Sequence, residues 1–278
     1  MNGEGTWTGV STDVSSTANP IVKRVRSLAQ RKHRQREAAT VVHGIQPVRQ
    51  AVEAGFAIEC LIVAPSLLSS ESTREFVDAQ SANVRVITVT GDVFRRLSDR
   101  DGPAGLAAIV GTRYSSPDHL VPDAGPVTVI ALDRIGNPGN LGTIVRTADA
   151  TGAAAVLLVG NTADPFDPVA IKASMGAVFN VPVARLPDLP DFFGWARERD
   201  LAVAATSARG QDPLWRTHYP DRLALLLGSE GDGLDEMSVH NADVSVAIPM
   251  VGTAESLNVA VAAGVLMYDV WRLRRPDH

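Results

Sequence analysis

The segment VTVIALDRIGNPGNLGTIVRTA, residues 127–148, indicates the kind of fold to expect in the second half of this 278-residue chain. An apolar run leads into a glycine-rich turn and then into a helix-like stretch. An apolar run without alternation is typical of a strand covered on both faces, as in a parallel sheet. The glycines at 136, 139 and 142 lack the spacing of a dinucleotide-binding turn, and no P-loop lysine follows. The segment therefore predicts one strand–turn–helix unit of a parallel sheet.

The rest of the second half repeats this alternation. Further strands are predicted at 154–160, 201–206, 222–228 and 244–250, with helices at 141–152, 167–178, 189–199 and 254–274. Ligands of such sheets bind beyond the carboxyl ends of the strands. The loops at those ends read GNPGNLG, ATSARG, GSEGDGL and IPMVGTAESLN. We therefore expect an α/β domain whose functional site lies along this edge.

The first half predicts a smaller α/β domain, because short apolar runs alternate with amphipathic stretches between residues 21 and 112. A Ser-, Thr- and Gly-rich tail precedes it, and a segment rich in Pro, Ser, Asp and Gly follows it. The expected organisation is a flexible tail at 1–20, a first domain at 21–112, a linker at 113–126 and a second domain at 127–278.

Several classes of protein are disfavoured by composition. No apolar run reaches the roughly 18 residues that a membrane-spanning helix needs, and the first residues lack the pattern of a signal peptide. We therefore expect a cytoplasmic protein without a membrane partner. The single cysteine, Cys60, excludes an intramolecular disulfide, and the six histidines show no paired spacing, so no metal site is expected.

A basic segment stands out in a chain whose net charge is −5. Residues 20–37 hold one acid, Glu37, and seven of the 26 Lys and Arg residues, namely Lys23, Arg24, Arg26, Arg31, Lys32, Arg34 and Arg36. A local concentration of positive charge suggests a polyanionic partner, here RNA phosphates. The alternative interpretation is a solvated helix face or a mobile arm. Aromatic residues make up only 5% of the chain, which argues against extensive base stacking.

The loops at the predicted sheet edge carry the candidate chemistry. Arg146 falls in the first turns of the helix after the glycine turn, where a guanidinium and a helix N-terminus together suit a phosphate or carboxylate. Glu230 follows the strand 222–228, and Ser256 and Asn258 stand at the start of the last predicted helix. Each loop alone has a simpler interpretation: glycines that relieve strain, a solvated acid, or an N-cap at Thr253 or Ser256.

Three blocks, NPGNLGTIVRTA, LLLGSEGDGL and IPMVGTAESLNVAVAAGVLMYD, resemble in order and spacing the three motifs of the SpoU (TrmH-type) RNA ribose 2′-O-methyltransferases. The resemblance spans residues 127–270. The upstream stretch VVHGIQPVRQAVEAG resembles, more weakly, the substrate-binding domain that many members carry. It has HGI where EGI is more usual.

The resemblance implies an α/β domain with a deep trefoil knot (the SPOUT fold) and S-adenosylmethionine as the cofactor. Carried over by motif, the cofactor contacts are Thr206, Gly228, Ile248 and Leu257. It also implies a homodimer, in which the long apolar last helix takes part in the contact.

The resemblance further implies that Arg146 is the key active-site residue. Arginine keeps its proton in proteins, so we expect Arg146 to bind a phosphate and to stabilise a developing alkoxide rather than to act as a base. Asn140 is expected to orient Arg146 or Glu230, and Glu230 to pair with the arginine. Ser256 and Asn258 are expected to hold the ribose or its phosphate.

The expected reaction is therefore methylation of a ribose 2′-hydroxyl in ribosomal RNA, with 23S RNA as the leading substrate and an antibiotic-resistance enzyme as one variant. A transfer-RNA methyltransferase is the alternative within the class; the first domain favours ribosomal RNA. A catalytically inactive RNA-binding or assembly factor is the alternative of another class, which the intact Arg146, Glu230, Ser256 and Asn258 disfavour. A nucleotide-binding oxidoreductase lacks its glycine fingerprint.

Overall fold

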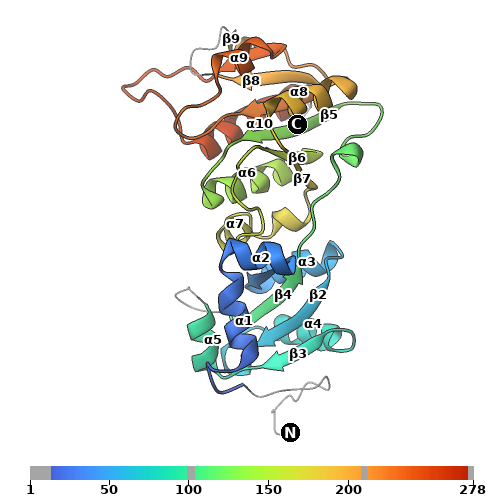
Figure 1. Ribbon diagram of the computed structural model, residues 1–278, viewed down its shortest axis with the longest axis vertical. Helices are drawn as coiled ribbons and strands as arrows, with labels where there is room; N and C mark the ends of the chain where they lie inside the picture. Colours follow the sequence, from blue (N-terminus) through green and yellow to red (C-terminus); the bar gives the residue numbers. More distant parts are fainter. Residues whose placement is uncertain (1–13, 99–103, 208–211, 275–278) are drawn as a thin grey trace. The chain divides into compact units, whose positions relative to one another are not determined.

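A computed structural model describes residues 14–98, 104–207 and 212–274, and the chain divides into two compact units (Figure 1). The first unit comprises Met1–Arg113 together with Phe166–Phe179, and the second comprises Tyr114–Pro165 and Asn180–His278. The boundary after residue 113 lies beside the predicted one. Segment 166–179, which lies inside the predicted second domain, belongs by its contacts to the first unit.

The first unit is built on a four-stranded mixed sheet with strand order β1-β4-β2-β3. Strand β4 pairs antiparallel with both β1 and β2, and β2 pairs parallel with β3. The strands are β1 (Ala39–His43), β2 (Ile58–Val63), β3 (Arg85–Thr88) and β4 (Leu106–Gly111). The helices of this unit are α1 (Pro20–Leu28), α2 (Arg31–Glu37), α3 (Ile45–Glu53), α4 (Glu71–Ser81) and α5 (Gly91–Leu97).

Segment 166–179 is anchored to this unit by specific contacts. The hydroxyl of Thr40 on β1 donates to the carbonyl of Phe166 at 2.7 Å. The rings of Phe166 and Phe179 lie 6.4 Å apart, and that of Phe56 lies 5.0 Å from Phe179. Gly176 has φ +91°, and a Cβ there would lie 2.8 Å from the Cα of Pro47. The short helix α7 (Pro168–Ala173) within this segment is therefore part of the first unit.

The second unit contains a seven-stranded sheet with order β7-β6-β5-β10-β8-β11-β9, in which every pair is parallel. This confirms the predicted parallel sheet. The strands are β5 (Val127–Asp133), β6 (Ala155–Val159), β7 (Val183–Leu186), β8 (Ala202–Thr206), β9 (Asp212–Pro213), β10 (Arg222–Leu227) and β11 (Val244–Ala247). The sequence patterns do not predict β7 or β9, which have four and two residues.

Asparagine or aspartate side chains cap the starts of four helices in the second unit: Asn137, Asp188, Asp235 and Asn258. These helices are α6 (Pro138–Ala150), α8 (Leu189–Glu198), α9 (Glu236–His240) and α10 (Val259–Arg274). Helix α6 begins three residues before the predicted start, because Asn137 accepts hydrogen bonds from the N–H groups of Gly139 and Asn140. Helix α10 begins at Val259 rather than at 254. No helix among the described residues is long and apolar enough to cross a membrane.

Candidate active site

Four neighbouring strands, β5, β10, β8 and β11, bring the predicted functional loops to one edge of the sheet. Thr206 ends β8, and Gly228 and Ile248 directly follow β10 and β11. The register aligns Leu226 with Ala205 and Val246 with Thr206. Three of the four predicted cofactor residues therefore lie at, or directly after, the ends of three adjacent strands. The fourth, Leu257, lies just before α10 and is 36% exposed.

Glu230 connects the loop after β10 to the loop after β5. Its Oε1 accepts hydrogen bonds from Nδ2 of Asn140 at 2.9 Å and from the backbone N–H of Asn137 at 3.3 Å. Its Oε2 accepts from the N–H of Gly136 at 3.2 Å. One carboxylate thus satisfies three donors of the glycine-rich turn. The sequence predicted the contact with Asn140 as one of two options.

Asn140 also contacts the third loop. Its Oδ1 accepts a hydrogen bond from Nδ2 of Asn258 at 3.2 Å. Asn258 in turn caps α10, because its Oδ1 accepts from the N–H groups of Ala260 and Val261 at 2.9 and 3.4 Å. The capping residue is therefore Asn258, and the expectation of a cap at Thr253 or Ser256 is wrong. Ser256 is exposed in the loop before the helix.

The N-terminus of α6 differs from the anion site that the sequence suggested. Its first amides already have acceptors: Asn137 takes those of Gly139 and Asn140, and Glu230 takes those of Gly136 and Asn137. A phosphate at this helix end would meet a carboxylate of the chain itself. The expected cradle of a helix N-terminus plus Arg146 is therefore not formed.

The pKa of Glu230 lies below its ordinary value. Partial burial acts to raise this pKa, but the hydrogen bonds from Asn140, Gly136 and Asn137 together outweigh it. The carboxylate is therefore ionised at neutral pH and can only accept hydrogen bonds. Such a group suits the positioning of a loop rather than proton abstraction.

Arg146 does not take part in this network. It is exposed on α6, and its side chain makes no hydrogen bond or ion pair with any residue that the structure describes. The expected ion pair with Glu230 is absent from these contacts, since Glu230 is engaged by the glycine-rich turn. The guanidinium of Arg146 is thus available to an external anion. Helix α10 packs beside α6, and a Cβ on Gly264 would lie 3.9 Å from Thr147.

Gly228 is required by the chain's own path. A Cβ at this position would lie 2.3 Å from the carbonyl carbon of Gly233 and 2.4 Å from the nitrogen of Leu234. The turn that folds back is closed by a hydrogen bond from the N–H of Gly233 to the carbonyl of Ser229. The sequence suggested that the glycines let a ligand approach, whereas at Gly228 the close approach is made by the loop itself.

Two further residues at this edge make contacts for which the sequence motifs alone predict no role. Asn137 lies in the first motif block and caps α6. Arg134 has φ +52° and contacts Oδ2 of the buried Asp133 at 2.9 Å through both Nε and Nη2. The hydrogen bond to Asp133 raises the pKa of Arg134, and the nearby Asp235 and Asp232 add to the effect. The dipeptide Asp-Arg at a strand end was the only signal in the sequence.

The basic segment at 20–37 divides into structural and exposed residues. Arg34 is 2% exposed and donates to the carbonyls of Leu28 and Ala29 and to Asp167. Its expected direct contact with RNA is therefore wrong, because the guanidinium serves to hold α7. Arg24 contacts Glu37 and Glu59. The residues of the segment that remain exposed are Lys23, Arg26, Arg31, Lys32 and Arg36.

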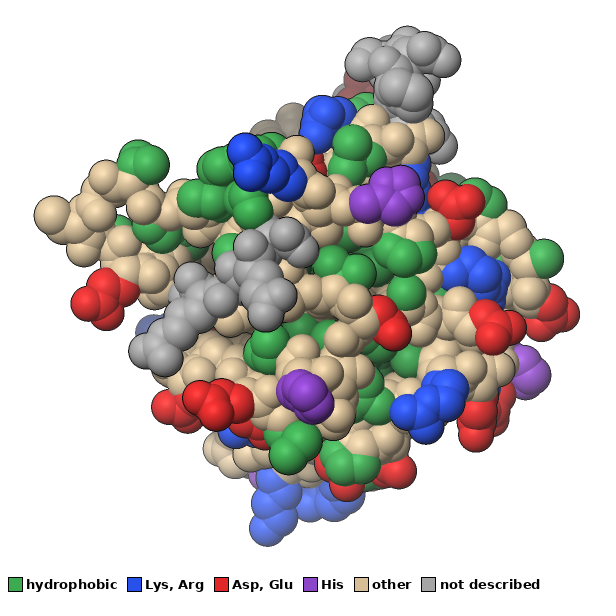
Figure 2. Space-filling view, turned by 90° about the horizontal axis from the view of Figure 1, so that it is seen from above, with side chains coloured by type: hydrophobic (Ala, Val, Ile, Leu, Met, Phe, Trp, Pro, Cys, Tyr) green, Lys and Arg blue, Asp and Glu red, His purple; other side chains and the backbone are tan. Residues whose placement is uncertain are grey.

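The face of the second unit drawn in Figure 2 shows no single run of basic side chains among the described residues. Figure 2 shows the face seen from the end at which β9 and α9 lie in Figure 1, and its acidic and basic side chains are interspersed. The described residues include no group of three or more His, Cys, Asp or Glu residues that could hold a metal ion.

The fold and the site define a class: an α/β protein with a parallel sheet whose carboxyl edge carries three linked motif loops, preceded by a separate basic unit. The chain belongs to the SpoU rRNA Methylase family, whose model matches residues 127–268. An MRM3-like substrate binding domain matches residues 19–108. The two matches correspond to the two halves that the sequence indicated.

Relatives and solved structures agree with this membership. An uncharacterized tRNA/rRNA methyltransferase of Mycobacterium avium is 35% identical over 92% of this chain and 85% of the relative. The 23S rRNA (guanosine(2553)-2′-O)-methyltransferase RlmP of Bacillus subtilis is 29% identical over 92% of this chain and 97% of the relative. The AdoMet-bound rRNA methyltransferase of Sinorhizobium meliloti matches with a TM-score of 0.84 and 34% identity, covering 95% and 98% of the two chains.

Proposed function

We propose that this chain transfers the methyl group of S-adenosylmethionine to a ribose 2′-hydroxyl of 23S ribosomal RNA. The observation that carries the proposal is the network in which Asn140 joins Glu230 and Asn258, and with them the three motif loops at one sheet edge. Membership of the SpoU family and similarity to a relative named as a 23S rRNA 2′-O-methyltransferase give this edge its chemistry.

The residues at this edge fit the cofactor. Ile248 is half-buried and Leu257 is partly exposed, so both offer apolar surface to a purine ring. Residues 250–257 belong to no helix or strand, which leaves backbone N–H and C=O groups for a ligand. Thr206, Gly228, Ile248 and Leu257 would hold S-adenosylmethionine. When bound, it supplies an electrophilic methyl group.

Arg146 is assigned the phosphate next to the target ribose. Its guanidinium remains protonated at any physiological pH, so it acts electrostatically and not as a base. A fixed positive charge near the 2′-oxygen favours the alkoxide character that develops as this oxygen attacks. Its lack of a partner within the described part of the chain supports this role.

Glu230, Asn140 and Asn258 are assigned positioning roles. Each holds a loop through the contacts described above, and together they keep the first motif beside the last. Orientation of the reacting groups contributes strongly to displacement reactions of this kind. Ser256, exposed one residue before Leu257, is assigned a hydrogen bond to the ribose or its phosphate.

A homodimer and a trefoil knot complete the proposal. Helix α10 exposes Val261, Val265 and Tyr268 at 52%, 38% and 50%, at a spacing that gives one helix face. An apolar stripe of this kind on a surface helix favours burial against a second copy. The knot rests on the family resemblance of the last loops.

A direct experiment tests the reaction and its substrate class. The purified full-length chain is incubated with methyl-labelled S-adenosylmethionine and either ribosomal or transfer RNA. Label in 23S RNA, with a reverse-transcription stop at low nucleotide concentration, supports the proposal. Label in transfer RNA alone assigns the chain to the alternative class. Cofactor-independent RNA binding without any label identifies an inactive factor.

A further inference from the structure

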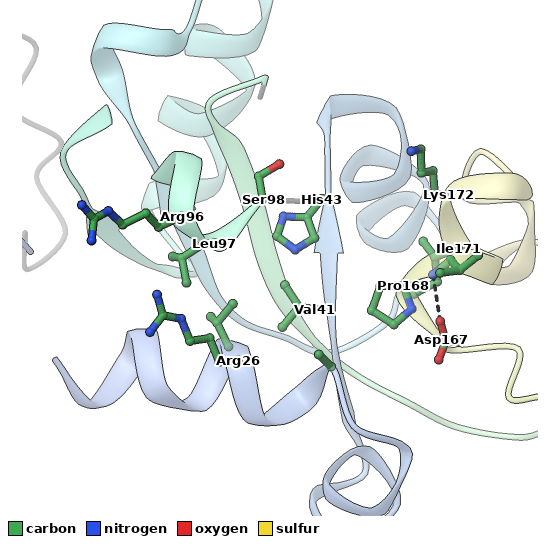
Figure 3. Close-up of a pocket in the computed structure, with 13 residues that line it drawn as sticks. Arg26, Val41, His43, Arg96, Leu97, Ser98, Asp167, Pro168, Ile171 and Lys172 are labelled. Carbon is green, nitrogen blue, oxygen red and sulfur yellow. Dashed lines mark hydrogen bonds between the residues drawn. The ribbon is translucent and has the colours of Figure 1, made fainter. Parts of the chain in front are cut away.

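A hollow of about 510 Å³ lies within the first unit (Figure 3). It is bounded by α1, β1, the end of α5 and the start of α7. Its walls are largely apolar, with side chains of Val25, Val41, Leu97, Pro168 and Ile171. The volume falls in the range of small-molecule sites, roughly 300–1,000 Å³. The hollow therefore has room for one nucleotide.

Three cations from three different elements surround this hollow. Figure 3 shows Arg26 from α1 and Arg96 from α5 on one side, and Lys172 from α7 on the other. All three are exposed, and none of their side chains makes a hydrogen bond or ion pair with another residue that the structure describes. The one acid in the lining, Asp167, already accepts from Arg34 at 2.7 Å and from the N–H of Val169 at 2.9 Å. The hollow is thus suited to a ligand that has a flat, weakly polar ring and negatively charged groups attached to that ring.

Two polar side chains complete the lining. His43, at the end of β1, is half-buried and points its imidazole into the hollow, and Ser98 presents a hydroxyl after α5. Unpaired RNA bases are recognised by stacking on histidine or arginine planes and by hydrogen bonds to their edges. The combination of ring, hydroxyl and guanidinium groups matches those requirements.

We propose that this hollow binds one unpaired nucleotide of the RNA substrate, outside the nucleotide that is methylated. The base lies against the apolar wall and the His43 ring, and the flanking phosphates contact Arg26, Arg96 and Lys172. The inference rests on the proposed function for its ligand. The exposed Lys23, on α1 with Arg26, continues the positive surface beyond the hollow.

The residues that line the hollow come from two separate regions of the sequence, although all of them belong to the first unit. The substrate-binding family model covers residues 19–108, whereas Pro168, Ile171 and Lys172 come from the SpoU segment. The ion pair between Arg34 and Asp167 and the bond from Thr40 to Phe166 hold that segment in the first unit. Arg34 thereby supports RNA recognition indirectly, by placing α7.

Binding by the full-length protein tests the proposal with two pairs of matched variants. The probe is a fluorescein-labelled, single-stranded RNA 12-mer of mixed sequence, measured by anisotropy. Ala29→Trp fills the hollow without changing charge, and Ala82→Trp is its control, since both alanines are exposed at helix C-caps. Arg96→Glu removes a cation beside the hollow, and Arg95→Glu makes the same charge change next to it on α5.

The two hollow variants are expected to weaken 12-mer binding by about tenfold relative to their controls, because a stacked base and a phosphate contact are both lost. For Arg96→Glu, the negative slope of log affinity against log salt concentration should also become shallower by about 0.7, because one phosphate contact is lost. Equal affinities within each pair would overturn the proposal. Circular dichroism checks that each variant is folded, and the exposed Arg96 provides a test that does not depend on packing.

Crosslinking and competing ligands identify what occupies the hollow. With 4-thiouridine in the 12-mer, adducts are expected on peptides that contain His43, Ser98 or residues 167–172. Adducts confined to other peptides would overturn the proposal. Calorimetry with the four nucleoside monophosphates provides another arm: tight binding that Ala29→Trp abolishes, with unchanged 12-mer affinity, would reassign the hollow to a free nucleotide. An equal loss of affinity for a duplex of the same sequence would exclude an unpaired base.

Failure of this inference is distinguishable from failure of the proposed function. If the wild-type chain methylates 23S RNA and Ala29→Trp does so equally well at limiting RNA, only the hollow's role is lost. If no methyl transfer occurs but the crosslinks fall in the hollow, only the proposed reaction is lost.

Discussion

Asn140 donates a hydrogen bond to Glu230 at 2.9 Å, across a separation of 90 residues in the sequence. The same amide accepts from Asn258, 118 residues away, at 3.2 Å. Strands β5 and β10 are neighbours in the sheet, so the loops after them meet at its carboxyl edge. A single side chain thus holds the three motifs together. Replacing Asn140 therefore tests whether it acts on the geometry of the loops or on the binding of the cofactor.

Asn140→Ala is expected to reduce kcat by about tenfold to a hundredfold, because small misplacements of reacting groups are costly in displacement reactions. The affinity for S-adenosylmethionine should change little. Single-turnover methylation and calorimetry measure the two quantities separately. A large loss of cofactor affinity with an unchanged rate would instead make Asn140 a cofactor ligand.

Arg146→Lys is expected to retain part of the RNA affinity but to lose most of the methylation rate, because an ammonium cannot reproduce the planar donors of a guanidinium. Filter binding and methyl incorporation supply the two readouts. Arg216→Lys, in the short 3-10 helix Leu214–Arg216, is a control outside the motif loops. Turnover equal to wild type in Arg146→Lys would refute a specific guanidinium role.

Glu230→Gln is expected to lower the melting temperature at pH 7, because one acceptor oxygen would become an NH2 donor that faces a backbone N–H donor, that of Gly136 or of Asn137. The pKa of Glu230 is lowered in the folded chain, so its contribution to stability is present above the ordinary pKa near 4.5. That contribution is lost as the pH falls from this value through the lowered pKa. The melting difference between the two proteins should therefore shrink on acidification. A difference that is constant from pH 7 to pH 3 would contradict the assignment.

Gly228→Ala is expected to destabilise the second unit by about 1–3 kcal/mol, a typical cost of forcing an extra group into a packed site. The added methyl group would collide with the backbone at Gly233 and Leu234. Gly231→Ala is the matched control in the same loop, since a Cβ there meets no atom within 4 Å. Thermal unfolding with and without S-adenosylmethionine compares the two. Equal stability would mean that the loop adjusts freely.

Arg34→Ala is expected to lower the free energy of unfolding by about 1–3 kcal/mol, because the carbonyls of Leu28 and Ala29 and the partly buried Asp167 lose their donor. Arg34 is 2% exposed and bound to Asp167, whereas Arg31 is exposed. Arg31→Ala should leave the unfolding free energy unchanged and weaken RNA binding. Urea unfolding and RNA anisotropy on both variants test this division. The opposite pattern would return Arg34 to the RNA-binding surface.

Local pattern determined much of this fold. Continuous apolar runs such as 127–133 and 222–227 predicted parallel strands, and the parallel pairing of β5 with β10 confirms them. The motif blocks were also sufficient to identify the family, because order and spacing of short motifs survive sequence divergence. Helix starts were less predictable: Asn137 and Asn258 act as caps, and which of several polar residues caps a helix depends on backbone geometry.

The sequence by itself therefore determined the class of fold and the edge of the sheet at which the motif loops gather. Only the tertiary structure decided what each side chain does. It directs Glu230 to the glycine-rich turn, buries Arg34 against Asp167 and places α7 in the first unit. The physical reason is range: periodicity is a property of neighbouring residues, whereas these partners lie 94 and 133 residues apart and meet only through packing.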